Sequence, residues 1–310
     1  MRRVLLVGAG EVGAKHLDAL TDADGLTVAG VADPCPRAAL PPDTPVFASW
    51  RAALTALNPQ LVVVAAPPGI ALAAARDAAA TGAAVLVEKP ATLDPADLVP
   101  QAGDERVFVG FQPHFAPGLN MLLVQPPAIK RAEVMLAVRR DPGYFRDWRR
   151  TYATAGGVLH QQAIHGLALA LRLLPGKVET VDAEVTHLRG LAESEDRVTA
   201  DITLADGRTI HIDAYIDHPG PPCHELFLHL ADGQHLSVRG RNLEAGLGEI
   251  AAAPTHEQLR RRMYAAVLDA AQEPAHPCLF PISALRRPLE VIDRVYRDAR
   301  RIRAADTVAA

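Results

Sequence analysis

The segment Val4-Leu5-Leu6-Val7-Gly8-Ala9-Gly10-Glu11-Val12-Gly13 decides the fold, because it joins a short aliphatic run to a glycine-rich turn. The aliphatic run is typical of a buried strand in a parallel sheet. The turn is a G-x-G-x-x-G sequence, and Leu17 and Leu20 follow it with helical spacing. Its glycines allow a tight turn, close approach of the backbone to a pyrophosphate and close packing of helix on strand. The segment therefore predicts a strand, a dinucleotide-binding turn and a helix whose N-terminus faces the phosphates.

An aspartate after the next strand supports dinucleotide binding. Residues 26–32 have the pattern of a strand, and Asp33 follows them, 20 residues after Gly13. A carboxylate at this distance accepts hydrogen bonds from the ribose 2′- and 3′-hydroxyls, and it repels a 2′-phosphate. The sequence therefore favours NAD as the cofactor. Arg37 leaves NADP open, because a guanidinium can neutralise that phosphate, although a solvated arginine at a helix start is an equally good interpretation.

Further aliphatic runs alternate with a helical segment. Residues 61–66, 83–87 and 107–111 have the pattern of buried strands, and residues 71–81 form an alanine-rich helical pattern after a loop at 67–69. Such alternation predicts a doubly wound parallel sheet, the Rossmann arrangement, in which ligands bind at the carboxyl ends of the strands. The tripeptide Glu88-Lys89-Pro90 ends one of these strands. Its two charges are therefore expected at the edge where a nicotinamide lies.

Composition sets the broad class. A chain of 310 residues predicts two domains, and a net charge of −4 gives no electrostatic footprint for nucleic acid. Cys35, Cys223 and Cys278 are scattered without metal-ligand spacing, which fits a reducing compartment. Only four apolar residues stand between Arg3 and Gly8, too few for a signal peptide, and no apolar run is long enough to span a bilayer. We expect a soluble, cytoplasmic protein with neither a nucleic-acid nor a membrane partner.

Six motifs in order resemble those of the glucose–fructose oxidoreductase, inositol dehydrogenase and MocA family. They are the glycine turn at 8–13, Asp33, "APP" at 66–68, "EKP" at 88–90, "GGVLHQQAIH" at 156–165 and the closing "PISALRRPLEVIDRVYRDARR". The resemblance covers nearly the whole chain. It implies an α/β protein with a Rossmann domain over residues 1–118 and an α/β domain with an open, largely antiparallel sheet over 119–283. A helix at about 284–302 is expected to pack back on the first domain.

The resemblance also implies a reaction. Family members transfer a hydride between NAD or NADP and a hydroxyl-bearing substrate such as a sugar, amino sugar, nucleotide-linked sugar or cyclitol. The lysine of "EKP", Lys89, corresponds to the acid/base, with Pro90 fixing the backbone through a cis bond and Glu88 orienting the lysine or contacting ribose. A histidine at the position of His165 faces the substrate. The predicted catalytic residues are Lys89, His165 and Gln161.

Two positions depart from the family pattern. Relatives usually carry aspartate where this chain has Gln161, four residues before His165, and often again where it has Ala168. An amide can orient a hydroxyl but cannot carry charge, so the usual Lys–Asp–His relay is incomplete. Lys89 and His165 would then share the acid/base role. Some relatives acting on nucleotide-linked sugars carry an amide in this motif.

The predicted site residues form two sets. The cofactor set is Gly8, Ala9, Gly10, Glu11, Val12, Gly13, Asp33, Arg37, Ala66, Pro67, Pro68, Glu88, Lys89 and Gln112. The substrate set is Lys89, His114, Tyr144, Trp148, Arg149, Gln161 and His165. An alternative role for His114 is that of a polar residue at the domain junction. No metal site is predicted, because "HELFLH" at 224–229 misses the H-E-x-x-H spacing and a strand places His224 and His229 on opposite faces.

The second half has strand and helix patterns that fit the open sheet. Strands are predicted at 129–140, 178–187, 196–205, 208–216 and 224–230, with D-G hairpin turns at 205–207 and 231–233. Helices are predicted at 158–174, 258–271 and 285–301. The free face of an open sheet often serves as an oligomer contact, so we expect a dimer or tetramer.

Two other functions stay open at this point. One is a regulatory protein that binds NAD(P) without catalysis. Lys89 and His165 argue against it, whereas Gln161 and Ala168 are compatible with it. The other is reduction of an imine or enone on the same scaffold, which the intact "EKP" makes less favourable.

Overall fold

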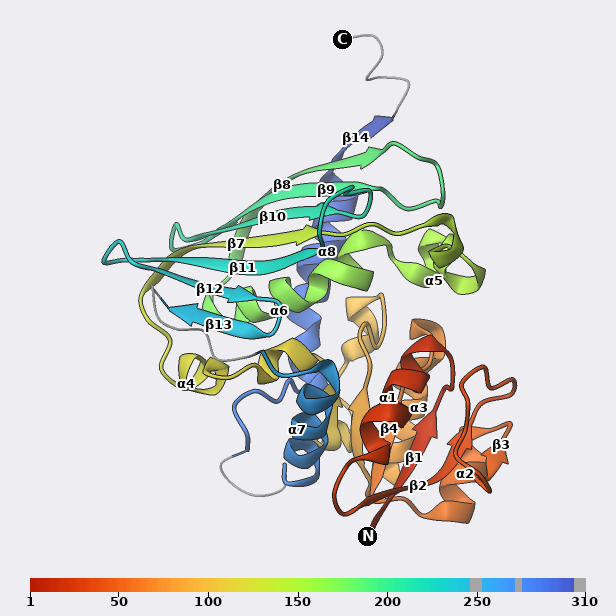
Figure 1. Cartoon of the computed structure of the whole chain (residues 1–310). Helices are drawn as coiled ribbons and strands as arrows, with labels where there is room; N and C mark the ends of the chain where they lie inside the picture. Colours follow the sequence, from red (N-terminus) through yellow and green to blue (C-terminus); the bar gives the residue numbers. More distant parts are fainter. Residues whose placement is uncertain (246–252, 271–274, 304–310) are drawn as a thin grey trace. The chain divides into compact units, whose positions relative to one another are not determined.

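The computed structural model describes residues 1–245, 253–270 and 275–303, and it divides into two compact units (Figure 1). The first unit comprises Met1–Thr92, Ala96–Phe115 and Pro254–Leu285. The second comprises Leu93–Pro95, Ala116–Ala253 and Arg286–Ala310. We describe each unit separately.

The sheet of the first unit is the predicted doubly wound one. Its six strands are β1 (Arg2–Val7), β2 (Leu26–Ala32), β3 (Val46–Phe47), β4 (Leu61–Val64), β5 (Ala84–Val87) and β6 (Val107–Val109). They lie in the order β3-β2-β1-β4-β5-β6, and every pair is parallel. The order changes direction between β1 and β4, and a sheet of this kind binds its ligand beside that point. The glycine turn after β1 therefore stands where a dinucleotide binds.

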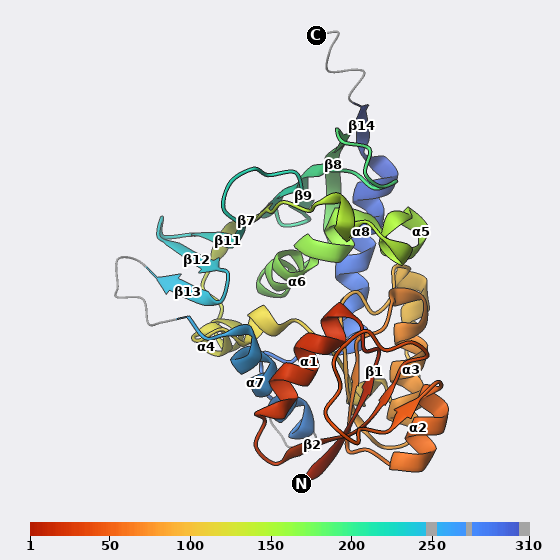
Figure 2. The ribbon, with the colours of Figure 1, turned by 45° about the vertical axis from the view of Figure 1, so that its right-hand side comes forward.

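Four main helices cover this sheet. Figure 2 shows α1 (Glu11–Thr21) and α7 (His256–Leu268) on one side, with α2 (Trp50–Leu57) and α3 (Pro68–Ala80) on the other. The sequence patterns predict neither β3 nor α2. The helix α3 begins three residues before the predicted start, because Pro68 stands at the first helical position, where proline is favoured. A capping box formed by Thr255 and Gln258 begins α7.

The second unit contains the predicted open sheet. Its eight strands are β7 (Ile129–Ala137), β8 (Val178–His187), β9 (Arg197–Leu204), β10 (Thr209–Tyr215), β11 (Cys223–Leu230), β12 (His235–Arg239), β13 (Asn242–Ala245) and β14 (Arg300–Arg303). Their order is β13-β12-β11-β7-β10-β9-β8-β14, and only the pairs β7–β10 and β8–β14 are parallel. The two predicted D-G turns join β9 to β10 and β11 to β12, both antiparallel. The strands β12, β13 and β14 were not predicted.

Among the described residues, helices lie on one face of this sheet. Figure 2 shows α6 (Ile164–Leu173) and α8 (Arg286–Asp298) on the same side of the sheet, where α6 contacts β7 and β11, and α8 contacts β8. Along β11 the buried Leu226 and Leu228 alternate with the half-exposed Phe227 and His229. The alternation confirms the strand predicted over the "HELFLH" segment.

The last helix, α8, lies on the sheet of the second unit, where it contacts β8 and α6. In the first unit, α7 lies against α1 and β5. That residues 284–302 also pack on the Rossmann domain stays a prediction. The helical pattern ends at Asp298, and β14 then extends the sheet beside β8 (Figure 1). An amphipathic pattern shows that a helix buries one side, but it does not say against which of two sheets.

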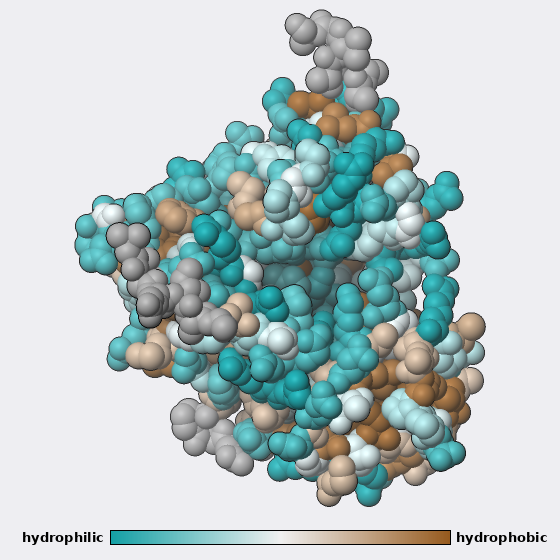
Figure 3. Space-filling view, in the orientation of Figure 1, coloured by the Kyte–Doolittle hydropathy of each residue, from teal (hydrophilic) through white to brown (hydrophobic). Residues whose placement is uncertain are grey.

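Short elements complete the described chain. They are α4 (Leu119–Val124), α5 (Tyr152–Ala155), a π turn (Leu159–Ala163) and 3-10 turns at Pro95–Leu98, Asp104–Arg106, Gln112–Phe115, Pro142–Tyr144, Asp147–Arg150 and Ile282–Leu285. Figure 3 shows a largely hydrophilic face. Within residues 1–245, 253–270 and 275–303, no helix is both long and apolar enough to cross a membrane.

Candidate active site

The turn between β1 and α1 has the geometry that its glycines predict. Gly8 has a φ of +90°, and a Cβ there would lie 2.6 Å from the Ala65 carbonyl oxygen. A Cβ on Gly13 would lie 2.2 Å from the Gly8 carbonyl oxygen. At Gly10, by contrast, a Cβ would meet no atom of the described chain within 4 Å. The first and third glycines are therefore required by the fold, whereas the middle one leaves open space for a pyrophosphate.

The N-terminus of α1 is open to an anion. Its N-cap residue, Gly10, has no side chain that could accept a hydrogen bond from the first turn. Among the described residues, none accepts a hydrogen bond from the backbone N–H of Val12 or Gly13. Because the first amides of a helix carry the positive end of its dipole, this turn fits the phosphates of a dinucleotide.

Asp33 lies beside this turn and is held by two backbone amides. Its Oδ2 accepts a hydrogen bond from the Ala9 N–H at 2.7 Å, and its Oδ1 accepts one from the Cys35 N–H at 2.7 Å. The Arg37 N–H donates to the Ala9 carbonyl at 3.0 Å, so the loop after β2 folds onto the turn. Each carboxylate oxygen keeps a lone pair for a ribose hydroxyl. The arrangement fits the predicted ribose-binding role, while the Arg37 side chain is exposed.

The loop after β4 supplies the other predicted residues near the switch point. Ala66 is half-buried and Pro67 is exposed, whereas Pro68 is buried in the first turn of α3. Pro68 therefore shapes the start of the helix rather than offering a free surface. Further along, Gln112 is half-buried, and its Oε1 is buried without a hydrogen-bond partner in the described chain. A buried acceptor of this kind suits a ligand donor.

The corner after β5 is fixed by a buried hydrogen-bond chain. Glu88 is 8% exposed, and its Oε1 lies 3.0 Å from Nε2 of the fully buried His16 of α1. The other ring nitrogen of His16, Nδ1, lies 2.6 Å from the Tyr264 hydroxyl of α7. A neutral imidazole satisfies both contacts when Nε2–H donates to Glu88 and Nδ1 accepts from Tyr264. Sequence patterns did not identify His16 or Tyr264, because the two residues stand 248 positions apart.

Electrostatics keeps the Glu88 carboxyl ionised. Burial alone would raise its pKa, but the hydrogen bond with His16 and the positive charges of Lys89 and Arg260 outweigh burial, so the pKa is lowered. Arg260 is itself 5% exposed, and its Nε and Nη1 have no hydrogen-bond partner among the described residues. The Glu88 carboxylate is therefore held in place by its contacts with the protein itself.

Lys89 follows this anchored carboxylate directly. Its backbone N–H donates to Glu88 Oε2 at 3.3 Å, and its bond to the buried Pro90 is cis, as expected from the resemblance. The lysine is half-buried. The structure therefore fixes the backbone from which the amine extends, at the carboxyl end of a central strand.

His114 does not line an open surface. Its side chain is 1% exposed, and its ring is stacked on Phe111 with 4.9 Å between centroids. A second aromatic ring, that of Phe280, lies 6.0 Å away. The burial favours the alternative role, a packed polar residue, over the predicted contact with a substrate.

In the second unit, a buried carboxylate fixes the start of the helix that carries Gln161 and His165. The backbone N–H of Val158 donates to Glu195 Oε1 at 2.8 Å, and the Tyr296 hydroxyl donates to the same oxygen at 2.7 Å. The Leu159 N–H donates to the Tyr296 hydroxyl at 3.0 Å. Gly157 has a φ of +86°, and a Cβ on it would lie 2.7 Å from that hydroxyl. The fold thus uses the glycine pair to bring the helix against Glu195 and Tyr296.

The helix begins with a π turn that contains two glutamines. The Tyr144 hydroxyl donates to Gln161 Oε1 at 2.6 Å, and Gln162 Nε2 donates to the Tyr144 hydroxyl at 2.8 Å. Arg140 Nη2 donates to Gln162 Oε1 at 2.8 Å. Gln161 is buried, whereas Gln162 and His165 are half-buried. π turns inside helices are frequent at functional sites.

Two guanidinium groups lie over the Tyr144 ring. The Cζ of Arg140 is 4.8 Å and that of Arg149 is 5.0 Å from its centroid, and Arg149 is also 4.7 Å from the centroid of the Trp148 ring. We call Arg140, Tyr144, Arg149, Gln161 and Gln162 the arginine–amide cluster. It joins three predicted substrate residues to two that were not predicted, and Trp148 stands at its edge.

The two missed residues had weak signals. Arg140 ends the segment predicted as a strand at 129–140, but β7 ends at Ala137, so alternation does not assign a side to Arg140. Gln162 adjoins Gln161, and helical spacing places neighbouring residues on different sides. A single hydroxyl, that of Tyr144, brings the two amides together.

No metal site is evident in the described segments. None of their His, Cys, Asp and Glu side chains form a group of three or more that could hold a metal ion. In β11, His229 instead lies with its Nε2 2.8 Å from Glu133 Oε1.

A dinucleotide-binding turn at the switch point of a parallel sheet, with a lysine at the end of a neighbouring strand, defines the class of NAD-dependent α/β oxidoreductases. Residues 2–101 match the model of the GFO/IDH/MocA oxidoreductase family, described as having an NAD-binding Rossmann fold. Residues 128–241 match the model of the C-terminal domain of the same family. The chain therefore belongs to the GFO/IDH/MocA family of oxidoreductases.

Solved structures show the same fold along the whole chain. The WlbA dehydrogenase from Bordetella pertussis, in complex with NADH and UDP-GlcNAcA, is 23% identical with a TM-score of 0.77, covering 98% of this chain and 97% of its own. GenD2 from gentamicin A biosynthesis, in complex with NAD, is 23% identical with a TM-score of 0.75, covering 99% and 95%. A myo-inositol dehydrogenase from Corynebacterium glutamicum is 17% identical with a TM-score of 0.72, covering 96% of both. No curated protein matches in sequence.

Proposed function

We propose that the protein oxidises a secondary alcohol of a sugar-like substrate, or reduces the corresponding ketone, with Lys89 and His165 as its acid/base residues. The observation that carries the proposal is the position of Lys89. It follows a central strand at the ligand-binding edge of the sheet, on a backbone anchored through Glu88, His16 and Tyr264. A side chain that extends from a fixed backbone is suited to proton transfer, which requires hydrogen-bond reach and a defined direction.

The cofactor site is formed by the first unit. The pyrophosphate would lie against Gly10 and the first-turn amides of α1, on a turn that Gly8 and Gly13 shape, and Asp33 would accept hydrogen bonds from the adenosine ribose. A bound nicotinamide dinucleotide supplies the hydride acceptor or donor. Because Asp33 is fixed by two amides and carries a negative charge, we propose a preference for NAD over NADP.

Lys89 and His165 would divide the proton transfer between them. Gln161 is an amide, so it can orient a hydroxyl but cannot take its proton. Its Oε1 accepts a hydrogen bond from the Tyr144 hydroxyl at 2.6 Å, which holds the amide in one orientation. We therefore assign to Gln161 the orientation of the substrate and to Lys89 and His165 the exchange of protons with its hydroxyl or ketone oxygen.

A nucleotide-linked or amino sugar is the substrate class that we favour. The arginine–amide cluster offers hydrogen-bond donors and a stacked ring, groups that suit a polyhydroxylated ligand. The complex of the WlbA dehydrogenase with UDP-GlcNAcA supports this choice by analogy of fold. Membership of an oxidoreductase family supports an enzyme over a non-catalytic regulator.

The first test compares wild type with Lys89→Ala. NADH and NADPH binding would be titrated by nicotinamide fluorescence, and each protein would be assayed with a panel of keto sugars, cyclitols and nucleotide sugars. We expect the cofactor Kd to change by less than about twofold, while kcat/KM falls by about 10²- to 10⁴-fold, the usual contribution of acid/base catalysis. Lys130→Ala removes another lysine, on the exposed surface of β7, and should match wild type.

Two results would contradict the proposal. If Lys89→Ala keeps the activity of Lys130→Ala, Lys89 is not the acid/base. If wild type binds NADH tightly but converts no member of the panel, oxidation or reduction of these sugars is excluded as its activity. Turnover of an imine or enone in the same assay would then support the reductase alternative.

We also propose a homo-oligomer that pairs through the open face of the second sheet. That face carries half-exposed Phe227 and His229 on β11 beside Glu133 on β7. Sedimentation equilibrium should give a dimer or tetramer, and a monomer at micromolar concentration would refute this. No disulfide joins any two of Cys35, Cys223 and Cys278 in the described chain, which supports the proposed location in the reducing cytoplasm.

A further inference from the structure

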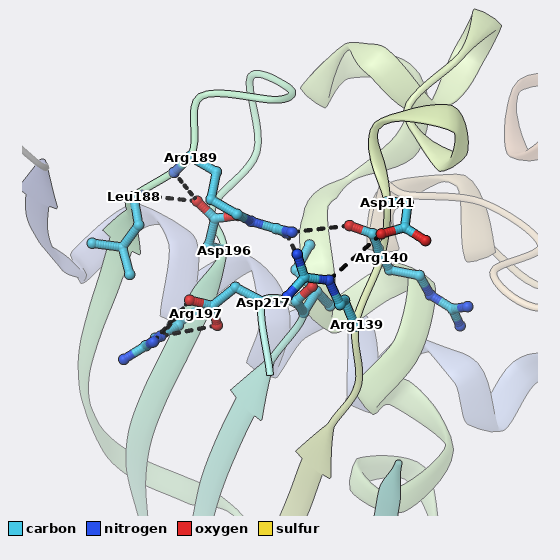
Figure 4. Close-up of polar contacts among 9 residues, drawn as sticks. Arg139, Arg140, Asp141, Leu188, Arg189, Asp196, Arg197 and Asp217 are labelled. Carbon is cyan, nitrogen blue, oxygen red and sulfur yellow. Dashed lines mark hydrogen bonds and ion pairs between the residues drawn. The ribbon is translucent and has the colours of Figure 1, made fainter. Parts of the chain in front are cut away.

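Arg140 differs in its partners from the arginines around it (Figure 4). Three neighbours are each paired with an aspartate: Arg139 with Asp141 at 3.5 Å, Arg189 with Asp196 at 2.7 Å and Arg197 with Asp217 at 2.8 Å. Arg140 forms no ion pair with a described carboxylate, and the group it donates to is the neutral amide of Gln162. Its Nε is buried without a hydrogen-bond partner in the described chain. A cation in this state is available to an anionic ligand.

The neighbouring network holds the backbone of Arg140 in place. Arg189 Nη1 donates to the Arg140 carbonyl at 2.9 Å, and the Arg140 N–H donates to the Ile216 carbonyl at 2.9 Å. Figure 4 shows the Arg140 side chain pointing away from the carboxylates of Asp196 and Asp217. A backbone fixed on both sides lowers the entropy cost of holding the guanidinium for a ligand.

The side chain of Arg140 is also directed by its contacts. Its guanidinium lies over the Tyr144 ring and donates a hydrogen bond to Gln162. These two contacts fix the position of the guanidinium and the direction of one of its N–H edges. The hydroxyl of the same tyrosine bonds to both glutamines. The guanidinium of Arg149 lies over the same ring and adds a second positive charge. The positive charges of Arg140 and Arg149 thus both lie over the ring of the tyrosine that contacts Gln161.

The amides complete the electrostatic pattern. A carboxylate at position 161, as the family resemblance leads one to expect, would repel an anion beside Arg140 and would bind the guanidinium itself. Gln161 and Gln162 fill the same space without negative charge. Guanidinium groups recognise carboxylates and phosphates through paired hydrogen bonds, which neutral hydroxyls do not reproduce.

We propose that Arg140 binds an oxyanion of the substrate, either a carboxylate on the sugar or a phosphate linked to it, beside the helix that carries Gln161 and His165. The inference rests on the proposed function, which it deepens by specifying a negatively charged substrate. Arg140 is then the residue that selects acidic over neutral sugars.

The test uses four probes and the NADH-saturated protein. Glucose, glucuronate, UDP-glucose and UDP-glucuronate separate the contributions of a carboxylate and of a phosphate. Binding to the NADH-saturated protein is measured by isothermal titration calorimetry, and oxidation of each probe is measured separately, with NAD⁺ as the hydride acceptor, by the absorbance of the NADH formed. Both are done for wild type, Arg140→Met, Arg140→Lys and Arg139→Met. Arg139→Met is the matched control, because Arg139 is exposed and paired with Asp141.

We expect Arg140→Met to weaken binding of the anionic probes by about 10- to 100-fold, as for loss of a charged hydrogen bond. Its binding of glucose should change little, and Arg139→Met should bind every probe as wild type does. Arg140→Lys should recover only part of the loss. An effect on glucuronate and UDP-glucuronate but not UDP-glucose identifies a carboxylate. An effect on both UDP-sugars, with glucuronate unaffected, identifies a phosphate.

Other outcomes overturn the inference. Equal binding of each probe by wild type and Arg140→Met, or equal losses for glucose and the acids, shows that Arg140 does not select an anion. Failure of wild type to bind any anionic probe at millimolar concentration has the same meaning. If Arg140→Met does not fold, as judged by circular dichroism, Arg140→Lys against Arg139→Lys gives the same comparison. Binding of an anion without turnover supports the inference while counting against the proposed reaction.

Discussion

Two helices of this protein begin after paired glycines, and the two starts serve different purposes. At α1 the backbone N–H groups of Val12 and Gly13 have no acceptor in the described chain. At the π turn that leads into α6, the N–H groups of Val158 and Leu159 are taken by Glu195 and Tyr296. The same signature, glycines before a helix, therefore leaves amides that fit a ligand in the first case and forms an internal anchor in the second. The distinction depends on whether the protein itself satisfies the first-turn amides.

The largest expected effect separates the roles of glycines within the first turn. Gly13→Ala places a Cβ 2.2 Å from a backbone carbonyl, so we expect the free energy of unfolding to fall by about 4 kcal/mol or more. Gly10→Ala meets open space, so unfolding should change by less than about 0.5 kcal/mol while the NADH Kd rises about tenfold. Urea unfolding and NADH titration measure the two quantities.

The pair of variants tests whether α1 is a ligand site at all. If Gly10→Ala binds NADH as wild type does, no pyrophosphate approaches that position. If Gly10→Ala is destabilised as strongly as Gly13→Ala, the middle glycine serves the fold and the comparison with the Glu195-capped helix loses its basis.

Much of the first site could be predicted because its constraints are local. Gly8, Gly13 and Asp33 are required by backbone conformations and distances within a single βαβ unit, which sequence spacing records. The aliphatic runs of β1, β4 and β5 are buried on both faces, so their pattern is also explicit.

The rest depends on contacts between distant segments. His16 and Tyr264 meet from α1 and α7, and nothing in either helix alone indicates a shared hydrogen bond. Arg140 and Gln162 meet from two segments, one held by Arg189 after β7 and the other by Glu195 at the helix start. The contact of α8 with β8 could not be predicted for the same reason, since an apolar stripe does not identify the surface that covers it.

The second prediction concerns the anchored helix start. Glu195→Ala leaves the Val158 N–H and the Tyr296 hydroxyl without their acceptor in a buried position, so we expect the free energy of unfolding to fall by about 2 to 3 kcal/mol. Glu179→Ala is the matched control, because the Glu179 side chain is exposed. Urea unfolding at constant pH measures the difference, and equal stability of the two variants would show that Glu195 does not anchor the helix.

The pH dependence of the same anchor has a defined sign. Burial raises the pKa of the Glu195 carboxyl above its ordinary value of 4.5. The folded protein then holds this proton more tightly than the unfolded chain does, so the stabilisation is complete below pH 4.5 and is lost as pH rises through the folded value. Glu195→Gln mimics the protonated acid and should lose less stability than wild type between pH 5 and pH 8. Parallel curves for the two proteins over this range would contradict the assignment.

The smallest expected effect tests how the open helix start selects its ligand. Asp33→Asn keeps an acceptor oxygen for the Ala9 or Cys35 amide but removes the charge that opposes a 2′-phosphate. We expect the ratio of the NADPH Kd to the NADH Kd to fall about tenfold, which is 1.4 kcal/mol. Arg37→Ala should change that ratio by less than about twofold, because the exposed guanidinium makes a screened contact at most. The proposed preference would be reversed if Arg37→Ala lost more NADPH affinity than Asp33→Asn gained. The Arg37 guanidinium, and not the Asp33 carboxylate, would then determine which dinucleotide binds.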